Sequence, residues 1–415
     1  MTNGTLSQNT DSGTILYMAM ELSATTWMLA FGDGSARKAR RRTVDAGDVG
    51  ALEREIELAK EKLGASAACD VVSCYEAGRD GFWIDRALSA RGVTNHIVES
   101  ASIEVNRRKR RAKTDALDVE ALLRLLMRFH GGDRAVWRTV RVPSEEDEDV
   151  RRLHRERERL QKEVTQLRNR TRGLLATQGV GCEPLEVVEF LKDARTRDDR
   201  ELGKKLVAEL TRMHERLTLL CTQLKAVEKE QGEAVRHPDA GDDRMKKITR
   251  MMCLRGIGLQ GAWLMVMEFF GWRQFRNRRE VGALAGLTGT PFNSGGSERE
   301  QGISKAGNKR VRQMVVELAW LWVRYQPASA LTRWFFERFG KSGARSRKVG
   351  IVALARKLLV ALWHFVDHGV IPDGAVLALS RGMSAAALED TRATCRAARS
   401  EAKKEAATPS PLALA

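Results

Sequence analysis

The usual signals of secretion, of a nucleotide cofactor and of a membrane span are missing from this chain. Its six cysteines are scattered and form no Cys-x-x-Cys pair, which is typical of reduced thiols in a cytosolic protein. No apolar run approaches the roughly 18 residues that span a bilayer, and the opening MTNGTLSQNTDSGT does not resemble a signal peptide. Neither Gly-x-Gly-x-x-Gly nor a P-loop occurs, so no nucleotide cofactor is implied. We therefore expect a cytoplasmic protein that is not attached to a membrane.

Acidic residues are too few to balance the basic ones. The chain has 71 Lys and Arg residues against 54 Asp and Glu, a formal net charge of +17. Lys and Arg neutralise phosphates and release counterions, so this charge favours a nucleic-acid partner, with solubility alone as the alternative explanation. The length of 415 residues predicts two or three domains, and a hydrophobic fraction of 43% is enough to give them cores.

The first part of the chain has the element order of a ribonuclease-H-like α/β fold, in which helices flank a mixed sheet. Residues 1–14 are polar and expected to be flexible. Three strands, a helix, a strand, a helix, a strand and a helix are predicted to follow within a domain over residues 15–142. Asp48 is the expected cap of the first helix, whose inner face carries Leu52, Ile56 and Leu63. The other expected elements are strands at 15–21, 26–31, up to 44, 71–76 and 96–98, and helices at 78–91 and 115–129.

The middle of the chain, over residues 143–244, is predicted to form two long helices. Apolar residues recur there in alternating steps of three and four, as in heptad repeats. This pattern is typical both of an antiparallel coiled-coil arm and of a dimer seam, and it does not distinguish them. The repeating positions are Val150, Leu153, Leu160, Val164, Leu167 and Leu174, with Arg157 and Thr171 in polar gaps, and then Leu206, Leu210, Met213, Leu217, Leu220, Leu224 and Val227.

The last folded region is predicted over residues 245–374. It is mostly α-helical, rich in Trp and Arg, and interrupted by glycine loops. Residues 375–415 are rich in Ala, Arg and Glu, and we expect them to form a low-complexity tail of frayed helix and disordered chain.

Four acidic residues fall where the predicted N-terminal fold would gather them. Glu21 ends the first strand, Glu76 ends the fourth, and Asp115 and Asp118 lie three residues apart on one face at a helix start. Each of them alone has a structural explanation, such as a helix N-terminus. Together they would repel one another unless cations neutralised them, and such oxygen ligands suit Mg²⁺ or Mn²⁺. Two such ions support phosphoryl transfer, so this pattern favours a metal site that acts on phosphate esters.

Positive charge is concentrated directly before the two aspartates. All but one of the seven residues in RRKRRAK are basic. The segment is either a solvated charged loop or a phosphate-contacting element that delivers nucleic acid to the metals. The basic residues are Arg107, Arg108, Lys109, Arg110, Arg111 and Lys113.

A serine-containing glycine loop lies in the segment AGLTGTPFNSGGSEREQGISKAGNKRVR. Ser294 would be exposed there, and a serine that attacks phosphorus requires activation by neighbouring cations or a metal-lined site. The alternatives are a basic loop in which Ser294 only supports a turn, or Ser297 or Ser304 as the nucleophile. The phosphate-binding charge around it is predicted to come from Arg299, Lys305, Lys309, Arg310 and Arg312.

The chain resembles the DEDD-type transposases of bacterial insertion sequences, which are bridge-RNA-guided serine recombinases. The matching stretches run in the family's order from about residue 15 to residue 369. They are CYEAG around Glu76, AKTDALDVEALLR around Asp115 and Asp118, RRLHRERERLQKEVTQLRNRTRGLLATQG, RGIG, AGLTGTPFNSGG, GISKAGNKRVR and VGIVALARKLL. The resemblance implies a RuvC-like N-terminal domain, a coiled-coil connector and a C-terminal transposase domain with a nucleophilic serine.

The same resemblance implies roles for individual residues. Glu21, Glu76, Asp115 and Asp118 would occupy the DEDD positions as catalytic metal ligands, and Ser294 would be the nucleophile that becomes joined to DNA. The first acid of the family is usually aspartate. Glutamate at position 21 would shift the metal ion by about one C–C bond, which is expected to alter metal preference or lower activity.

Partners also follow from the resemblance. We expect donor and target DNA, a structured guide RNA, and a homo-oligomer, a dimer or tetramer, in which the serine of one subunit meets the carboxylates of another. The expected location is the bacterial cytoplasm, at the nucleoid. Two alternatives stay open: a metal-dependent nuclease or Holliday-junction-resolvase-like enzyme that uses water, and a nucleic-acid-binding scaffold whose acidic site has decayed at Glu21.

Overall fold

The computed structural model describes residues 15–35, 38–104, 115–239, 241–294, 297–378 and 388–397, without the side chains of residues 101, 115, 116, 291–294 and 297–301. The chain divides into two compact units, Met1–Ser144 and Glu145–Ala415. The arm predicted over residues 143–244 and the helical region after it therefore belong to one unit. The polar segment 1–14, the basic segment 107–113 and the tail after residue 397 lie outside the described residues.

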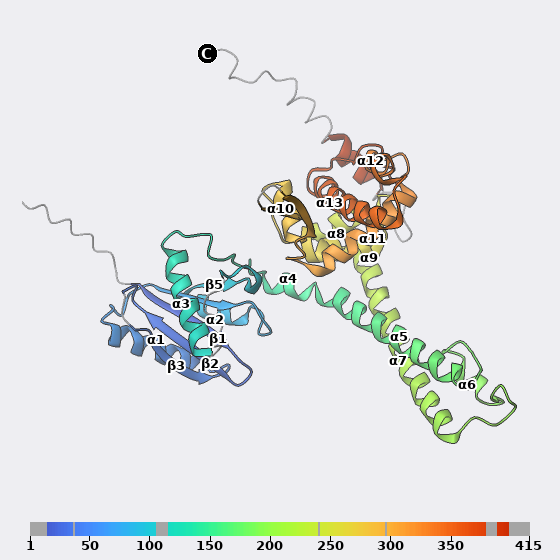
Figure 1. The fold of residues 1–415 in the computed structure, drawn as a ribbon, viewed down its shortest axis with the longest axis horizontal. Helices are drawn as coiled ribbons and strands as arrows, with labels where there is room; N and C mark the ends of the chain where they lie inside the picture. Colours follow the sequence, from blue (N-terminus) through green and yellow to red (C-terminus); the bar gives the residue numbers. More distant parts are fainter. Residues whose placement is uncertain are drawn as a thin grey trace, which may run out of the picture. The chain divides into compact units, whose positions relative to one another are not determined.

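The first unit is built on a five-stranded mixed sheet with the strand order β3-β2-β1-β4-β5 (Figure 1). The strands are β1 (Leu16–Leu22), β2 (Thr26–Gly32), β3 (Arg40–Asp45), β4 (Val71–Glu76) and β5 (Thr94–Val98). The first three pair in antiparallel fashion, and β4 and β5 add in parallel to β1. The strands and helices follow one another in the predicted order, and the expected mixed α/β sheet is confirmed.

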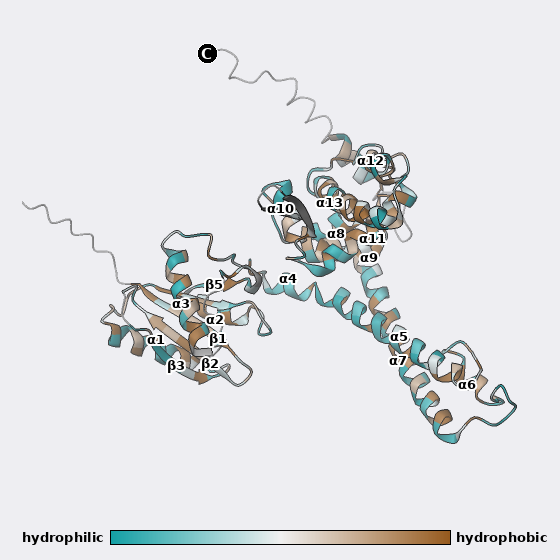
Figure 2. Ribbon diagram, viewed as in Figure 1, coloured by the Kyte–Doolittle hydropathy of each residue, from teal (hydrophilic) through white to brown (hydrophobic). Residues whose placement is uncertain are grey.

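Helices cover both faces of this sheet. The helices α1 (Val49–Leu63) and α2 (Trp83–Ser89) pack on the face that carries Leu16, Met18 and Met20 of β1. The helix α3 (Asp115–His130) packs on the other face, against Ala19 and Cys74. A short 3-10 turn, η1 (Ser100–Ser102), lies between β5 and α3. Residues of β1, β2 and β4 alternate between the two cores, and Figure 2 shows the apolar colour of the central strands.

The first helix follows the sequence prediction closely, and the second does not. The Asp48 side chain accepts a hydrogen bond from the Ala51 amide and caps α1, as expected. The helix predicted over residues 78–91 begins only at Trp83. Gly81 has a φ of 67°, in the left-handed region, and its carbonyl accepts a hydrogen bond from the Tyr75 hydroxyl at 3.2 Å. This contact from the preceding strand holds the connection in a turn that a helix cannot contain.

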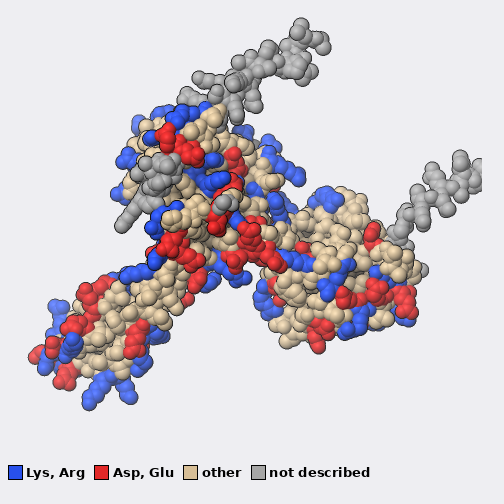
Figure 3. Space-filling model, turned by 180° about the vertical axis from the view of Figure 1, so that it is seen from behind, with Lys and Arg blue, Asp and Glu red and all other residues tan. Residues whose placement is uncertain are grey.

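The second unit begins with a helical arm. It comprises α4 (Glu145–Asp149), α5 (Arg152–Ala176), α6 (Val187–Phe190) and α7 (Lys204–Arg236). The helices α5 and α7 run antiparallel, since Arg157 near the start of α5 pairs with Glu228 near the end of α7 at 2.7 Å. At the other end, Leu175 packs with Leu210. Figure 3 shows basic and acidic side chains mixed along this arm, at lower left.

The body of the second unit is a helical bundle that carries one hairpin. Its helices are α8 (Asp243–Met252), α9 (Leu259–Met265), η3 (Val266–Phe270), α10 (Arg278–Leu284), α11 (Lys309–Tyr325), α12 (Ala330–Phe339) and α13 (Ala344–His368). By length and composition α13 is apolar enough to cross a membrane, although Arg356 and Lys357 interrupt its apolar residues. Ten of its residues are buried within the bundle, among them Leu354, Leu358 and Leu362. Its hydropathy is that of a core helix.

The segment predicted as a glycine loop forms an antiparallel hairpin. Its strands are β6 (Gly289–Ser294) and β7 (Ser297–Ile303), and Ser294 lies opposite Ser297 in the register. We call residues 289–303 the serine hairpin. Part of the segment predicted as a low-complexity tail is helical, over residues 388–397, and its Thr391 and Cys395 are buried. All six cysteines lie within the described residues, and each is free.

Candidate active site

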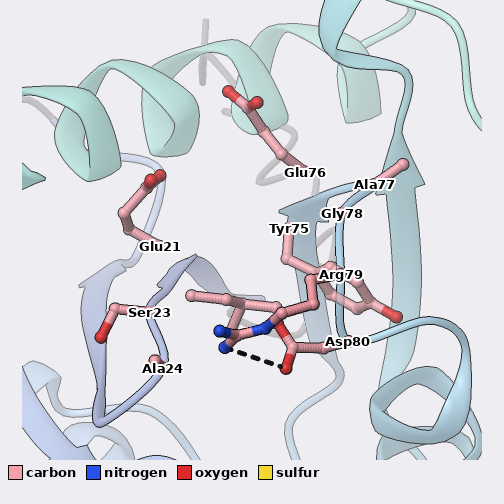
Figure 4. A pocket seen from close by; sticks show the side chains of 10 residues that line it. Glu21, Ser23, Ala24, Tyr75, Glu76, Ala77, Gly78, Arg79 and Asp80 are labelled. Atoms are coloured by element: carbon pink, nitrogen blue, oxygen red, sulfur yellow. Dashed lines mark ion pairs between the residues drawn. The ribbon is translucent and has the colours of Figure 1, made fainter. Parts of the chain in front are cut away.

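Two of the four predicted carboxylates lie side by side at one edge of the sheet. Met20 of β1 is paired with Tyr75 of β4, and the next residue along each of these parallel strands is Glu21 and Glu76. Two residues earlier, Ala19 and Cys74 face the core beneath α3. Side chains alternate along a strand, so Glu21 and Glu76 share that face. Figure 4 shows both carboxylates pointing toward the side on which α3 crosses the sheet.

The direction of α3 brings its acidic first turns to the same edge. At the C-terminal end of the helix, His130 Nδ1 lies 3.0 Å from the hydroxyl of Tyr17, near the start of β1. The strand advances about 13 Å from Tyr17 to Glu21, and the helix rises about 18 Å from His130 back to Asp118. The helix runs opposite to β1, so Asp118 is level with Glu21 or slightly beyond it. Leu122, one turn after Asp118, packs against the sheet.

A cavity of ≈ 280 Å³ opens between the ends of β1 and β4. Its polar lining includes Glu21, Ser23, Glu76, Arg79 and Asp80. The guanidinium of Arg79 lies 3.6 Å from the Asp80 carboxylate (Figure 4). The sequence prediction did not include Arg79, although it directly follows the CYEAG stretch. The cavity therefore joins three carboxylates with one cation, and oxygen ligands and a guanidinium suit a metal ion and a phosphate group, respectively.

The carboxylate of Glu76 affects its buried neighbour. Burial raises the pKa of the Cys74 thiol well above its ordinary value, and the negative charge of Glu76 adds to this effect. The thiol therefore stays protonated and unreactive. Within the described side chains, no group of three or more His, Cys, Asp and Glu residues is close enough to hold a metal ion. Asp115 begins α3, but its side chain is not among those described. The carboxylate oxygens that are present are donors of the kind that Mg²⁺ prefers.

The predicted serine site lies in the other unit. Ser294 ends β6, and its side chain is outside the description, as are those of Ser297 and Arg299. Ser304 lies at the base of the hairpin, where its amide donates to the Thr288 carbonyl at 2.8 Å. The structure thus places Ser294 at the tip of the hairpin and the competing Ser304 at its foot.

The predicted phosphate-binding residues near the hairpin fall into two groups. Lys305 and Lys309 are exposed, and Lys305 has a left-handed φ of 57°. Arg310 pairs with Glu158 of α5 at 2.7 Å, and Arg312 donates to the Ala285 carbonyl at 3.1 Å. These two arginines already have partners within the unit, so contact with nucleic acid would require them to exchange those partners. The basic residues between 107 and 113 lie outside the described residues.

A mixed sheet flanked by helices, with acidic residues at the ends of adjacent strands, is compatible with a ribonuclease-H-like domain. Comparison with known proteins agrees with this class. Residues 34–178 match the transposase family DEDD_Tnp_IS110. Residues 248–333 match the family described as Transposase IS116/IS110/IS902 family.

Curated relatives extend the likeness over most of the chain. A putative transposase, y4rJ, of Sinorhizobium fredii is 41% identical over 374 residues, which are 87% of this chain and 94% of that protein. The transposase for insertion sequence element IS1328 of Yersinia enterocolitica is 26% identical over 262 residues, or 62% of this chain and 73% of that protein. A probable family 20 transposase of Pseudomonas aeruginosa is 29% identical over 261 residues, or 62% and 72%.

This chain belongs to the IS116/IS110/IS902 family of insertion-sequence transposases. It is a DNA transposase of the DEDD type, and its DEDD domain implies that the reaction depends on a divalent metal ion.

Proposed function

We propose that this transposase cuts and rejoins DNA strands through Ser294, next to Mg²⁺ held by Glu21, Glu76, Asp115 and Asp118. The observation that carries the proposal is the placement of Glu21 and Glu76 on adjacent strands, beneath the acidic N-terminal end of α3. Carboxylates gathered in this way require a cation to offset their repulsion. Mn²⁺ has similar ligand preferences and is expected to substitute.

The protein residues would divide the chemistry between them. The four carboxylates would hold the metal, and the bound metal would supply electrostatic stabilisation of the charge that develops at phosphorus. Arg79, beside the carboxylates, would contact a neighbouring phosphate. The basic residues at 107–113, with Arg299, Lys305, Lys309, Arg310 and Arg312, would hold the nucleic-acid backbone.

The serine step is a transesterification that needs no external energy. The Ser294 hydroxyl gives up its proton, and its Oγ forms a bond to a DNA phosphorus while one P–O bond of the strand breaks. The released deoxyribose oxygen takes up a proton. The reverse attack by a sugar hydroxyl on the phosphoserine frees the serine and seals a strand, so the number of phosphodiester bonds does not change.

The partners in this proposal are donor DNA, target DNA and a structured guide RNA that selects both by base pairing. The chain would act as a homo-oligomer, a dimer or tetramer, in which the serine hairpin of one subunit meets the carboxylates of another. The paired helices α5 and α7 would serve as a coiled-coil connector between a RuvC-like domain over 15–142 and a transposase domain over 245–374. The expected location is the bacterial cytoplasm, at the nucleoid.

A covalent adduct tests the proposal. The full chain is purified with its co-purifying RNA and mixed with Mg²⁺ and labelled duplexes that carry the ends of its own insertion element and a target site. Wild type should form a protein–DNA adduct that survives denaturation, and Ser294→Ala should not. Chelation of the metal should abolish the adduct. Sequencing of the co-purified RNA identifies the guide.

Other outcomes separate the alternatives. An adduct that persists in Ser294→Ala would exclude this serine as the nucleophile, and Ser297→Ala and Ser304→Ala would then be compared. Cleavage by Ser294→Ala, without an adduct in wild type, would indicate a nuclease or junction resolvase that uses water. Absence of cleavage even after Glu21→Asp restores the acid usual in the family would indicate a nucleic-acid-binding scaffold.

A further inference from the structure

A buried carboxylate lies in the middle of the second unit, far in sequence from every predicted site residue. Glu268 is in the π-helical turn η3, where the Gly271 amide donates to the Val266 carbonyl five residues earlier at 2.7 Å. Its side chain is 2% exposed. Turns of this kind are uncommon and often lie at functional sites. A buried carboxylate is costly unless donors surround it, so its partners define what it does.

The donors come from two different parts of the unit. From α5, His154 Nε2 lies 2.9 Å from the carboxylate, and Arg155 donates from Nε at 2.7 Å and from Nη2 at 3.0 Å. From the residue before α11, the Asn308 amide donates at 3.2 Å. A carboxylate only accepts, so all of these groups point at it as donors. Glu268 therefore connects the arm to the start of α11.

Asn308 also fixes the foot of the serine hairpin. Its side-chain oxygen accepts from the Arg310 and Val311 amides and caps α11, and its backbone amide donates to the Leu284 carbonyl at 2.9 Å. The Lys305 backbone amide donates in the same way to the Gly286 carbonyl at 3.1 Å. We call residues 304–308 the hairpin base. The base is thus held by backbone hydrogen bonds on one side and by Glu268 on the other.

The same helix α5 makes a second contact with this region. Glu158, one turn after Arg155, accepts from Arg310 Nε at 2.7 Å. Five residues of β6 lie between the hairpin base and Ser294, a distance of about 17 Å along the strand. A tilt of the hairpin by about 5° at its base would therefore move Ser294 by about 1.5 Å. Misplacement of a reacting group by about 1 Å costs roughly 100-fold in rate.

We propose that Glu268 is a positioning residue, which holds the base of the serine hairpin against α5 through Asn308 and thereby sets the position of Ser294. This inference rests on the proposed role of Ser294 as the nucleophile. Because the Glu268 side chain is buried, it would act through the hairpin base and not by direct contact with DNA.

The test uses Asn308→Asp in the full chain. Truncation of Glu268 would leave the buried His154 and the partly exposed Arg155 without their partner and would endanger the fold. Aspartate, by contrast, caps a helix as well as asparagine does. The substitution would replace the amide donor by a second carboxylate that faces Glu268. The matched control is Asn277→Asp, because Asn277 caps α10 through the Arg279 and Glu280 amides in the same way. Measured quantities are the adduct rate at saturating DNA, the affinity for the labelled element duplex, and hydrogen exchange over residues 284–288 and 304–308.

We expect Asn308→Asp to lower the adduct rate about 10- to 100-fold, with DNA affinity unchanged and faster exchange at the hairpin base. Asn277→Asp should match wild type in all three. Equal behaviour of the two variants would overturn the inference, as would a loss of rate that only follows a loss of DNA affinity. If wild type forms no adduct that depends on Ser294, the proposed function fails. In that case, hydrogen exchange at the hairpin base still tests whether Asn308 holds the base to Glu268. Exchange in Asn308→Asp that equals exchange in wild type would overturn that link.

Discussion

The hydroxyl of Tyr17 lies 3.0 Å from Nδ1 of His130, which shows that the C-terminal end of α3 lies beside the start of β1. Tyr17 is near the start of β1, and His130 ends α3. The acidic end of the helix consequently lies over the C-terminal ends of β1 and β4. The helix and the strand run in opposite directions, so the N-terminal end of α3 lies toward the strand ends that carry Glu21 and Glu76.

Loss of one carboxylate charge in this site should remove activity without loss of DNA binding. Glu76→Gln and Glu21→Gln keep the size of the side chain but bind a cation poorly. We expect adduct formation to fall at least about 100-fold, because even the outer partners of metal ligands contribute 10- to 100-fold. Gel analysis of the labelled adduct measures this. Glu53→Gln, on the exposed side of α1, is the control and should retain full activity. Full activity in both site variants would exclude the metal site.

Arg79 should contribute one phosphate contact. Arg79→Ala is expected to weaken binding of the labelled duplex and to lower the slope of log affinity against log salt by about 1. Binding titrations at several salt concentrations measure the slope. Arg91→Ala is the matched control, since Arg91 is a partly exposed arginine of the same unit that pairs with Glu53. An unchanged slope in Arg79→Ala would remove this residue from the interface.

Gly307 should be essential to the hairpin base. Its φ is 100°, and a Cβ at this position would lie 2.2 Å from the Leu284 carbonyl oxygen. Gly307→Ala is expected to destabilise the unit by about 1–3 kcal/mol and to lower the adduct rate. Urea unfolding and the adduct assay measure the two effects. Gly289→Ala serves as the control, because a Cβ there meets nothing within 4 Å and the backbone is extended. Equal stability of the two variants would contradict the expected strain.

Stability of the second unit should depend on the charge of Glu268. Burial by itself raises the pKa of this carboxyl, but hydrogen bonds from His154 and Arg155 and their positive charge outweigh it, so the pKa lies well below its usual range. Arg151 adds a further positive charge nearby. Because the pKa of Glu268 is lower in the folded chain than in the unfolded chain, its charge stabilises the fold above the unfolded-state pKa of about 4.3. This stabilisation is lost progressively as the pH falls from about 4.3 toward the lower folded-state pKa.

Comparison of wild type with Glu268→Gln at two pH values measures this contribution. At pH 7 we expect the variant to be less stable in urea by about 1–3 kcal/mol, since it loses the charge-assisted hydrogen bonds from His154 and Arg155. At pH 3 the difference should shrink as the wild-type carboxyl loses its advantage. Glu228→Gln removes a more exposed partner of Arg157 and should change stability by less than about 1 kcal/mol at either pH. A difference that does not depend on pH would refute the charge-based explanation.

Features that depend on neighbouring residues were predictable. The strand pattern predicted that Glu21 and Glu76 lie at the ends of the first and fourth strands, and Asp48 predicted the start of α1. The hairpin was not predicted, because the glycines around Ser294 are compatible with a loop as well as with a turn between strands. The start of α2 was misplaced because the Tyr75 hydroxyl, from another element, holds Gly81 in a turn. The hydropathy of α13 does not distinguish a helix buried in a bundle from a helix buried in lipid. The tertiary structure shows that α13 is buried in the bundle.

Glu268 shows where prediction ends. The segment MVMEFF presents one acid among apolar residues, which was a signal of a buried, partnered charge. Its partners could not be named, since His154 is 114 residues away and Asn308 is 40 residues away.

The sequence by itself determined the order of elements in the first unit, the family and the acids at the strand ends, because periodicity, capping and short motifs involve residues that are close in sequence. Only the tertiary structure decided that α3 opposes β1, that Arg79 joins the carboxylates, and that a buried glutamate links the arm to the serine hairpin. Those relationships rest on contacts between residues tens to more than a hundred positions apart, whose geometry arises only when the cores pack.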